Sequence, residues 1–282
     1  SRKQISWPSV LLTVALSWIG SAQAQTLWTN AGTGDWTTGS NWSAGVPNSS
    51  IEATIENGGT ATLASAAAAN SVFIGSTGGN GTLSITGGSL TLDVHSYLGY
   101  NGGTGTASIS GGTWSSTGQL LVGAYGNASL AITGGAVSAG ESYIAYGGIG
   151  TATVSNGTWS AGNLLIGYAP GLAATGTLTV NSGTVTTDSI TLAGSQDGII
   201  AATGSINLNG GTLSTKDITE SNGSGGAHIN FNGGTLRALQ NKPIFFVGLD
   251  PGDVQLLAGG GIIDTDSYNI GIDTVLQGAG NL

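Results

Sequence analysis

The sequence predicts an all-β protein, a right-handed parallel β-helix (solenoid) with about seven to nine turns. Glycine supplies 52 of 282 residues and charged residues only 7%. Ordinary amphipathic helices, which need Leu, Glu, Lys and Ala at helical spacing, are therefore not expected. A ten-residue segment recurs seven times, and each copy alternates apolar and small polar residues. Because 39% of residues are apolar and they recur in register, the composition does not indicate disorder.

Residues 1–24 have the pattern of a signal peptide. Arg2 and Lys3 form a short basic region, and an apolar run from Trp7 to Gly20 follows. Residues 22–24, Ala-Gln-Ala, then match the small-x-small pattern of a cleavage site. The apolar run is short for a membrane span. We expect an exported bacterial protein, secreted or at the cell surface, whose mature chain begins near residue 25.

Residues 25–66 are predicted to cap the solenoid. Trp28, Trp36 and Trp42 cluster here, ahead of the first repeat. Solenoids need a cover over the exposed end of their core, and the three indoles suit that role. The alternative is a patch on which sugar rings stack.

Residues 67–238 hold the repeats, and each copy places a glycine at the second position of a predicted corner. The spacings between successive glycines are 24, 23, 22, 26, 28 and 23 residues, a loose period that is typical of a solenoid with variable loops. These glycines are Gly88, Gly112, Gly135, Gly157, Gly183, Gly211 and Gly234.

Three sets of apolar residues keep a constant distance from these glycines. Those three residues before them are Ile85, Ile109, Ile132, Val154, Val180, Leu208 and Phe231. Those two residues after them are Leu90, Trp114, Val137, Trp159, Val185, Leu213 and Leu236. A second strand, seven to ten residues after each glycine, contributes Leu98, Val122, Ile144, Ile166, Leu192 and Ile218, with Ile74 in the same place before the first repeat. Because equivalent positions carry equivalent residues, parallel stacking into buried columns is favoured over an antiparallel sheet.

Residues 239–282 are predicted to form degenerate turns of the same solenoid, continuing beyond the end of this chain. Their closing stretch is LLAGGGIIDTDSYNIGIDTVLQGAGNL (256–282). With the glycine-rich repeat and the segment LWTNAGTGDWTTGSNWSAGVP (27–47), it resembles autotransporter passenger domains that carry the autotransporter-associated β-strand repeat. Complete members of that family end in a membrane barrel, which this sequence lacks. The resemblance implies outer-membrane anchoring only through a segment absent from this chain.

Charge excludes several classes of partner. Beyond the signal peptide, three basic residues stand against 14 acidic ones, so the formal net charge falls from −9 to −11. A chain this acidic has no electrostatic basis for binding nucleic acid or anionic membranes. No cofactor is expected, and His95 and His228 are isolated, so no metal is expected. Asp250 with Asp253, and Asp264 with Asp266, lack the spacing of known calcium loops and are predicted to be solvated turns.

Two surface columns are candidates for ligand contact. Tyrosines recur after the second strand in four successive repeats, and these candidate ligand-stacking residues are Tyr100, Tyr125, Tyr146 and Tyr168. Such a column stacks on glycans or a partner, or it is an aromatic ladder that lines a corner. The second column carries hydroxyls and is compatible with an ice-binding surface, although threonine is also common on solvated strands. It comprises Thr82, Thr106, Ser129, Thr151, Thr177 and Ser205.

No catalytic residues are predicted, and the chain is not expected to be an enzyme. Lyases and hydrolases that act on polysaccharide need a base near carboxylates or paired carboxylates, whereas the basic residues beyond the signal peptide are only Lys216, Arg237 and Lys242. The favoured function is an adhesin or structural spacer that contacts host-cell or matrix glycans, or its own copies. The alternatives are a polysaccharide-acting enzyme and an ice-binding protein. Asp188 and Lys216 are expected to pair across adjacent turns.

Overall fold

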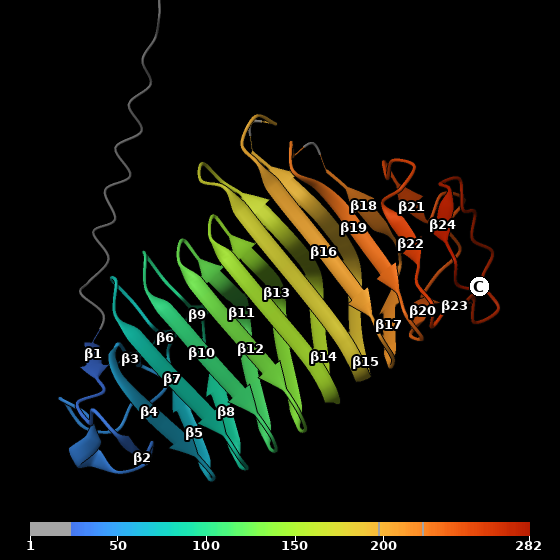
Figure 1. Ribbon diagram of the computed structural model, residues 1–282. Helices are drawn as coiled ribbons and strands as arrows, with labels where there is room; N and C mark the ends of the chain where they lie inside the picture. Colours follow the sequence, from blue (N-terminus) through green and yellow to red (C-terminus); the bar gives the residue numbers. More distant parts are fainter. Residues whose placement is uncertain (1–23, 197, 222) are drawn as a thin grey trace, which may run out of the picture.

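The computed structural model describes residues 24–282, except residues 197 and 222, and shows a parallel β-solenoid of about 11 turns. The predicted signal peptide, apart from its last residue, lies outside the described residues. The described part contains no α-helix, only a single 3-10 turn, η1 (Gly39–Asn41). None of its helices is long and apolar enough to cross a membrane. Figure 1 shows the turns stacked along one axis, with the chain entering at one end and leaving at the other.

Each complete turn contributes strands to three parallel ladders, which we call faces A, B and C. Face A contains β1 (Ala24–Leu27), β3 (Ile51–Ile55), β6 (Val72–Ile74), β9 (Ser96–Leu98), the last parts of β11 (Thr113–Ala124), β13 (Ala136–Tyr146), β14 (Ile149–Ala169) and β15 (Ala174–Ser195), then β18 (Ile218–Glu220) and β21 (Phe246–Val247).

Faces B and C complete the cross-section. Face B contains β2 (Thr33–Asp35), β4 (Asn57–Leu63), β7 (Asn80–Ile85), β10 (Thr104–Ile109), β12 (Asn127–Ile132), the first parts of β14 and β15, β16 (Ala202–Leu208), β19 (Gly226–Phe231), β22 (Val254–Leu256) and β24 (Leu276–Gly278). Face C contains β5 (Ala66–Ala69), β8 (Ser89–Leu92), earlier parts of the four long strands, β17 (Thr212–Thr215), β20 (Thr235–Ala238) and β23 (Ile262–Asp264).

The pairing confirms the predicted parallel architecture but gives more turns than expected. β1 already pairs with β3, and β2 with β4, so parallel stacking begins before the first recognisable repeat. At the other end β22 pairs with β24. Prediction from the seven clear repeats undercounts these turns, because the flanking segments keep the strand geometry without keeping the glycine template.

The core is a set of stacked apolar columns. The column from Ile85 to Phe231 is in unbroken register on face B, and every member is fully buried. The column from Leu90 to Leu236 is in register on face C and is also buried. Each such side chain stabilises the fold by about 1.5–3 kcal/mol. Both predicted columns are confirmed.

The predicted column on face A is correct except at its last member. Ile218 pairs with Ile190, two residues earlier than expected, and Glu220 takes the place opposite Leu192. The register is constant through this turn, because Val180, Val185 and Ile190 pair with Leu208, Leu213 and Ile218. Ile218 lies seven residues after its corner glycine, Gly211, whereas Leu192 lies nine after Gly183. A carboxyl group therefore occupies a position that is apolar in the preceding turns.

Corner lengths explain the loose period. Two residues join β11 to β12, and two join β13 to β14, whereas residues 170–173 separate β14 from β15 and residues 196–201 separate β15 from β16. All these connections lie at the corner between faces A and B, and the two longer ones belong to the turns with 26- and 28-residue spacing. Figure 1 shows them as protruding loops along one edge.

The N-terminal tryptophans are buried. Trp28, Trp36 and Trp42 are at most 4% exposed and pack edge to face, with ring centroids 5.0 and 4.8 Å apart. The Trp42 Nε1–H donates to the Trp36 carbonyl oxygen at 2.7 Å. Rings buried in this way extend the core at this end, as a cap does, and cannot stack on a sugar.

Candidate functional site

The candidate site is the outer surface of face A, where aromatic side chains gather. Strand alternation directs Leu98 and Ile144 inward and Tyr97 and Tyr143 outward. In register, the outward row along successive turns is Phe73, Tyr97, Leu121, Tyr143 and Leu165. This row was not predicted from the sequence. Each of its members directly precedes an inward apolar residue of face A, and this position is the sequence feature that could have identified the row.

The predicted tyrosine column lies beside this row, at the corner with face B, but it is interrupted. Tyr146 pairs with Tyr168 on one side and with Ala124, not Tyr125, on the other. Tyr125 follows one residue later with a φ of 62°, and this left-handed backbone turns its ring onto Tyr146, with centroids 5.3 Å apart. The expectation of a regular four-tyrosine column is therefore wrong at one position, where β11 carries alanine.

The two rows form one continuous patch, which we call the aromatic surface. It consists of Phe73, Tyr97, Tyr100, Leu121, Tyr125, Tyr143, Tyr146, Leu165 and Tyr168. Phe73 stacks on Tyr97 at 4.8 Å, and Tyr146 stacks on Tyr168 at 5.5 Å. Six of the seven tyrosines of the chain lie here. Most of the rings are half-buried, and Tyr125 is exposed.

The patch has a hollow at its centre. The turn that carries Leu121 and Ala124 lies between two turns that carry tyrosine at equivalent positions, and these smaller side chains leave a cavity of about 270 Å³, the central pocket. The pocket is lined by Tyr97, Tyr100, Gln119, Leu121, Ala124, Tyr125, Tyr143 and Tyr146. A second cavity of about 530 Å³ adjoins it, where Leu172 of the 170–173 loop lines the same space as Tyr100 and Tyr125.

A polar row runs along the other side of the aromatic row. It comprises His95, Gln119, Glu141 and Asn163, in successive turns. The Gln119 side-chain amide and the Tyr143 hydroxyl both donate to Glu141 Oε2, at 2.8 and 2.9 Å. Burial, reinforced by this hydrogen bond to a carboxylate, raises the pKa of Tyr143. Tyr143 therefore remains a neutral donor and is held in place.

His95 is neutral at physiological pH. Burial lowers the pKa of its imidazole, and its Nδ1 accepts a hydrogen bond from the Gln119 main-chain N–H at 3.0 Å. In the neutral ring the proton is then on Nε2, which is a donor. The ring lies over Gly118, where any Cβ would come within 2.6 Å of Nδ1.

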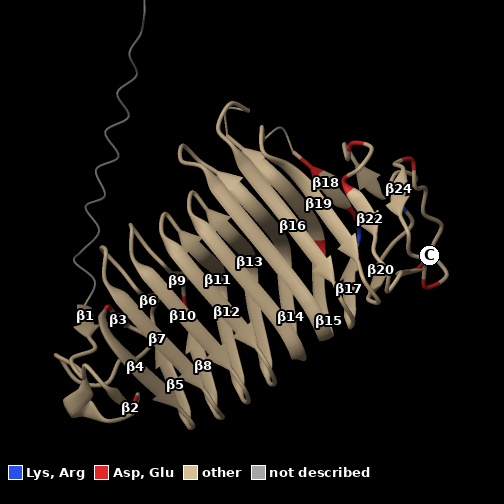
Figure 2. Ribbon diagram, in the orientation of Figure 1, with Lys and Arg blue, Asp and Glu red and all other residues tan. Residues whose placement is uncertain are grey.

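All Lys and Arg residues in the described part of the chain are paired with carboxylates, away from the aromatic surface. Lys216 contacts Asp188 at 2.7 Å, which confirms that predicted pair. Arg237 contacts Asp264 at 2.8 Å, and Lys242 contacts Asp217. Figure 2 shows these charges toward the C-terminal end, whereas the turns from β6 to β14 carry no basic residue. The Lys216–Asp188 pair is exposed, and exposed pairs stabilise by at most about 1 kcal/mol.

The remaining candidates from the sequence have structural roles. The main-chain N–H of Asp250 donates to the Asp253 carboxylate, and that of Asp266 to Asp264, so both pairs lie in turns as predicted. Within the described residues no group of three His, Cys, Asp or Glu side chains is placed to hold a metal ion. The hydroxyl column is in register on face B and faces solvent.

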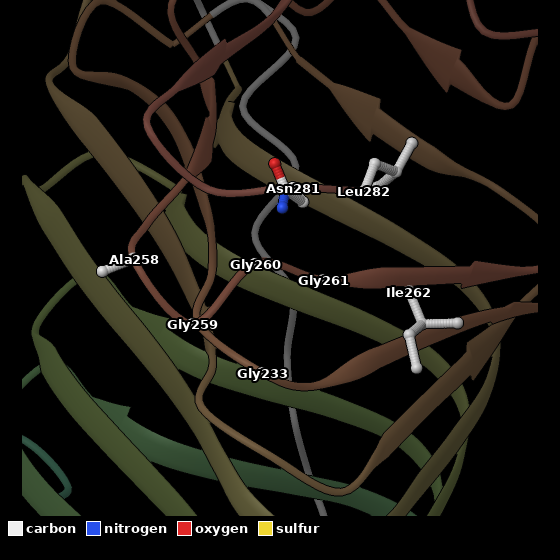
Figure 3. A pocket seen from close by; sticks show the side chains of 8 residues that line it. All are labelled: Gly233, Ala258, Gly259, Gly260, Gly261, Ile262, Asn281 and Leu282. Carbon is white, nitrogen blue, oxygen red and sulfur yellow. The ribbon is translucent and has the colours of Figure 1, made fainter.

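Another cavity, of about 270 Å³, lies near the C-terminal end (Figure 3). Four of its eight lining residues are glycines, and Asn281 is the one lining residue with a polar side chain. Figure 3 shows a space bounded mostly by main chain. Such a lining has little chemistry to offer a ligand.

No family model, curated protein or solved structure matches the chain. The function is therefore inferred from the geometry of the aromatic surface.

Proposed function

We propose that this protein is a rigid β-solenoid that binds an extended polymer or a cell surface through its aromatic surface, without chemical turnover. The observation that carries the proposal is the concentration of six of the seven tyrosines on one face of a rod. Aromatic rings exposed in this way are typical of surfaces that stack on ligands. Repeated along the rod, weak contacts add into useful avidity.

The direct test replaces the four partly exposed tyrosines Tyr100, Tyr125, Tyr146 and Tyr168 by Ser. Each ring contact contributes about 0.5–1.5 kcal/mol, so the variant should bind cells or immobilised glycans at least about tenfold more weakly. Tyr143 is left in place because it is 9% exposed and packs within the sheet surface. Equal adhesion by the variant and the unmodified protein would show that the tyrosines are only structural.

A control variant carries Ala at Thr106, Ser129, Thr151 and Thr177 on face B. It has the same number of substitutions on a different face, so adhesion should be unchanged. The same variant addresses the ice-binding alternative. Thermal hysteresis in the unmodified protein that disappears in this variant would favour an ice-binding surface instead.

The absence of turnover is a separate part of the proposal. Glu141, the carboxylate beside the central pocket, accepts two hydrogen bonds from protein donors, and a lyase or hydrolase would need a second acid or a base near it. Incubation with the bound polysaccharide should release no unsaturated or reducing ends. Reproducible release of either product would assign an enzyme.

We further propose that the chain is exported and displayed as a passenger-like adhesin or spacer. The basic residues and apolar run of the first 24 residues support export, and a long rod is the shape of a spacer. Expression in a bacterial host should give surface-labelled protein whose N-terminal sequence begins near residue 25. Retention of an uncleaved leader inside the cell would contradict this assignment.

A further inference from the structure

The geometry points to the central pocket as a subsite for one sugar ring of a neutral glycan. This inference rests on the proposed function and specifies its ligand. The pocket exists because Ala124 occupies a position where the turns on either side carry Tyr100 and Tyr146. A full tyrosine column would fill the space. The interruption therefore creates a hollow of about 270 Å³ inside an otherwise continuous aromatic patch.

The lining suits a pyranose ring. Ligand pockets usually measure about 300–1,000 Å³. This one, at about 270 Å³, is slightly smaller, so it holds a single ring rather than a long segment. Tyr97 and Tyr143 supply aromatic rings on either side of Leu121. Gln119 supplies a carboxamide at the edge, and its orientation is fixed by Glu141. Flat apolar rings with a few fixed polar groups are what a sugar ring, apolar on its face and polar at its rim, requires.

The charges select a neutral ligand. None of the eight lining residues is Lys, Arg, His, Asp or Glu, and Glu141 lies immediately beside them. Within residues 24–282 as the structure describes them, an acidic polysaccharide would meet this carboxylate without a Lys or Arg nearby, because Lys216, Arg237 and Lys242 are engaged in ion pairs in later turns. Beside the pocket a basic polypeptide would find Glu141, whose Oε2 already accepts two hydrogen bonds, while Glu52 lies at a neighbouring cavity with Phe73 and Tyr97. A neutral glycan needs neither charge.

The test substitution is Ala124→Tyr, which adds the side chain that the neighbouring turns already accommodate and fills the pocket. Affinity electrophoresis through gels that contain a soluble neutral glucan or galactomannan measures binding, with polygalacturonate and polylysine as comparisons. We expect the unmodified protein to bind a neutral polymer, and Ala124→Tyr to weaken this binding at least tenfold. The control is Thr191→Tyr. Thr191 pairs with Leu165 in the outward row of face A, beyond the pocket, so a tyrosine there should leave binding within twofold.

The outcomes separate this inference from the proposed function. If Ala124→Tyr binds as well as the unmodified protein while the four-tyrosine variant does not, the surface binds polymer but the pocket is no subsite. Preference for polylysine, lost between 50 and 500 mM salt, would assign a basic polypeptide and overturn the neutral-glycan inference. If Ala124→Tyr does not fold, Gln119→Leu provides the second test: it keeps the size of the side chain, removes its hydrogen-bonding groups and should also weaken binding at least tenfold.

Discussion

At the scale of single residues, the fold depends on which side chains the strand alternation directs inward. Val154 lies between Ile132 and Val180 and is fully buried. On the same strand, Thr153 and Thr151, one and three positions before Val154, point outward. Glu220 is the exception, because it is half-buried and lies opposite Leu192, at a position that is apolar in the preceding turns. These residues make the assignment of inside and outside testable.

Replacing Val154 by Asp should destabilise the protein by about 3–5 kcal/mol, because the buried carboxylate has no partner. Denaturant unfolding followed by circular dichroism measures the change. The matched control is Thr151→Asp, an exposed position on the same strand, which should cost less than about 1 kcal/mol. Equal stabilities for Val154→Asp and the unmodified protein would show that this residue is not buried.

Glu220 should make stability depend on pH. Burial, with the neighbouring carboxylates of Asp253 and Asp250, raises the pKa of Glu220 to about 7 from an ordinary value of 4.5. The folded protein thus holds a proton that the unfolded chain releases, so this residue makes the free energy of unfolding fall as pH rises from about 4.5 to 7. Above pH 7 the residue is ionised in both states and the loss is complete.

The Glu220→Gln variant isolates this effect. The stability of Glu220→Gln minus that of the unmodified protein should be larger at pH 8 than at pH 5. Thermal unfolding of both proteins across this range measures the difference. Asp253→Asn should move the midpoint of the transition to lower pH, because a neutral amide no longer repels the ionised Glu220. A difference between Glu220→Gln and the unmodified protein that stays constant from pH 5 to pH 8 would contradict the assignment.

At the scale of elements, the corners decide where each strand ends. Five of the seven predicted corner glycines have positive φ, but in the corners of Gly157 and Gly234 the preceding residue, Asn156 or Gly233, takes that conformation. The glycine pattern therefore predicted the positions of the corners correctly. It identified the residue with positive φ in five of the seven corners. Sequence could not show the difference, because Asn-Gly and Gly-Gly pairs both permit either arrangement.

Adjacent glycines in one corner should respond differently to the same substitution. Gly88 has a φ of 64°, and a Cβ there would lie 2.2 Å from the Ser65 carbonyl oxygen. Gly88→Ala should therefore lower the free energy of unfolding by at least about 1–2 kcal/mol. At Gly87 the nearest atom to a Cβ is 3.3 Å away, so Gly87→Ala should cost clearly less. The reverse order in chemical unfolding would show that this corner is misassigned.

At the scale of the whole molecule, the sequence predicts the architecture better than the site. The seven repeats were sufficient for parallel stacking and for two complete core columns, because a solenoid repeats one local environment along its axis. The interrupted tyrosine column was not predictable in the same way. Ala124 and Tyr125 are adjacent in sequence, and only the pairing of β11 with β13 shows which of them aligns with Tyr146.

The aromatic surface is also a property of the whole rod. Its rows come from five successive turns, so no single turn forms the surface alone. The long connections after β14 and β15 occur at the same edge, and Leu172 of the first lines the cavity beside Tyr100 and Tyr125. The variable parts of the repeat thus adjoin the proposed binding face, as expected where loops carry function on a rigid scaffold.

Hydroxyl-radical footprinting of the tyrosines, with and without a bound polysaccharide, tests whether the aromatic surface is the binding face. Tyr268 is 38% exposed and lies in the C-terminal turns, outside the aromatic surface, so it serves as an internal control. Binding at the aromatic surface predicts slower oxidation of Tyr100, Tyr125, Tyr146 and Tyr168 in the bound state, with Tyr268 unchanged. Bound protein in which those four tyrosines are oxidised at their free rates would contradict it.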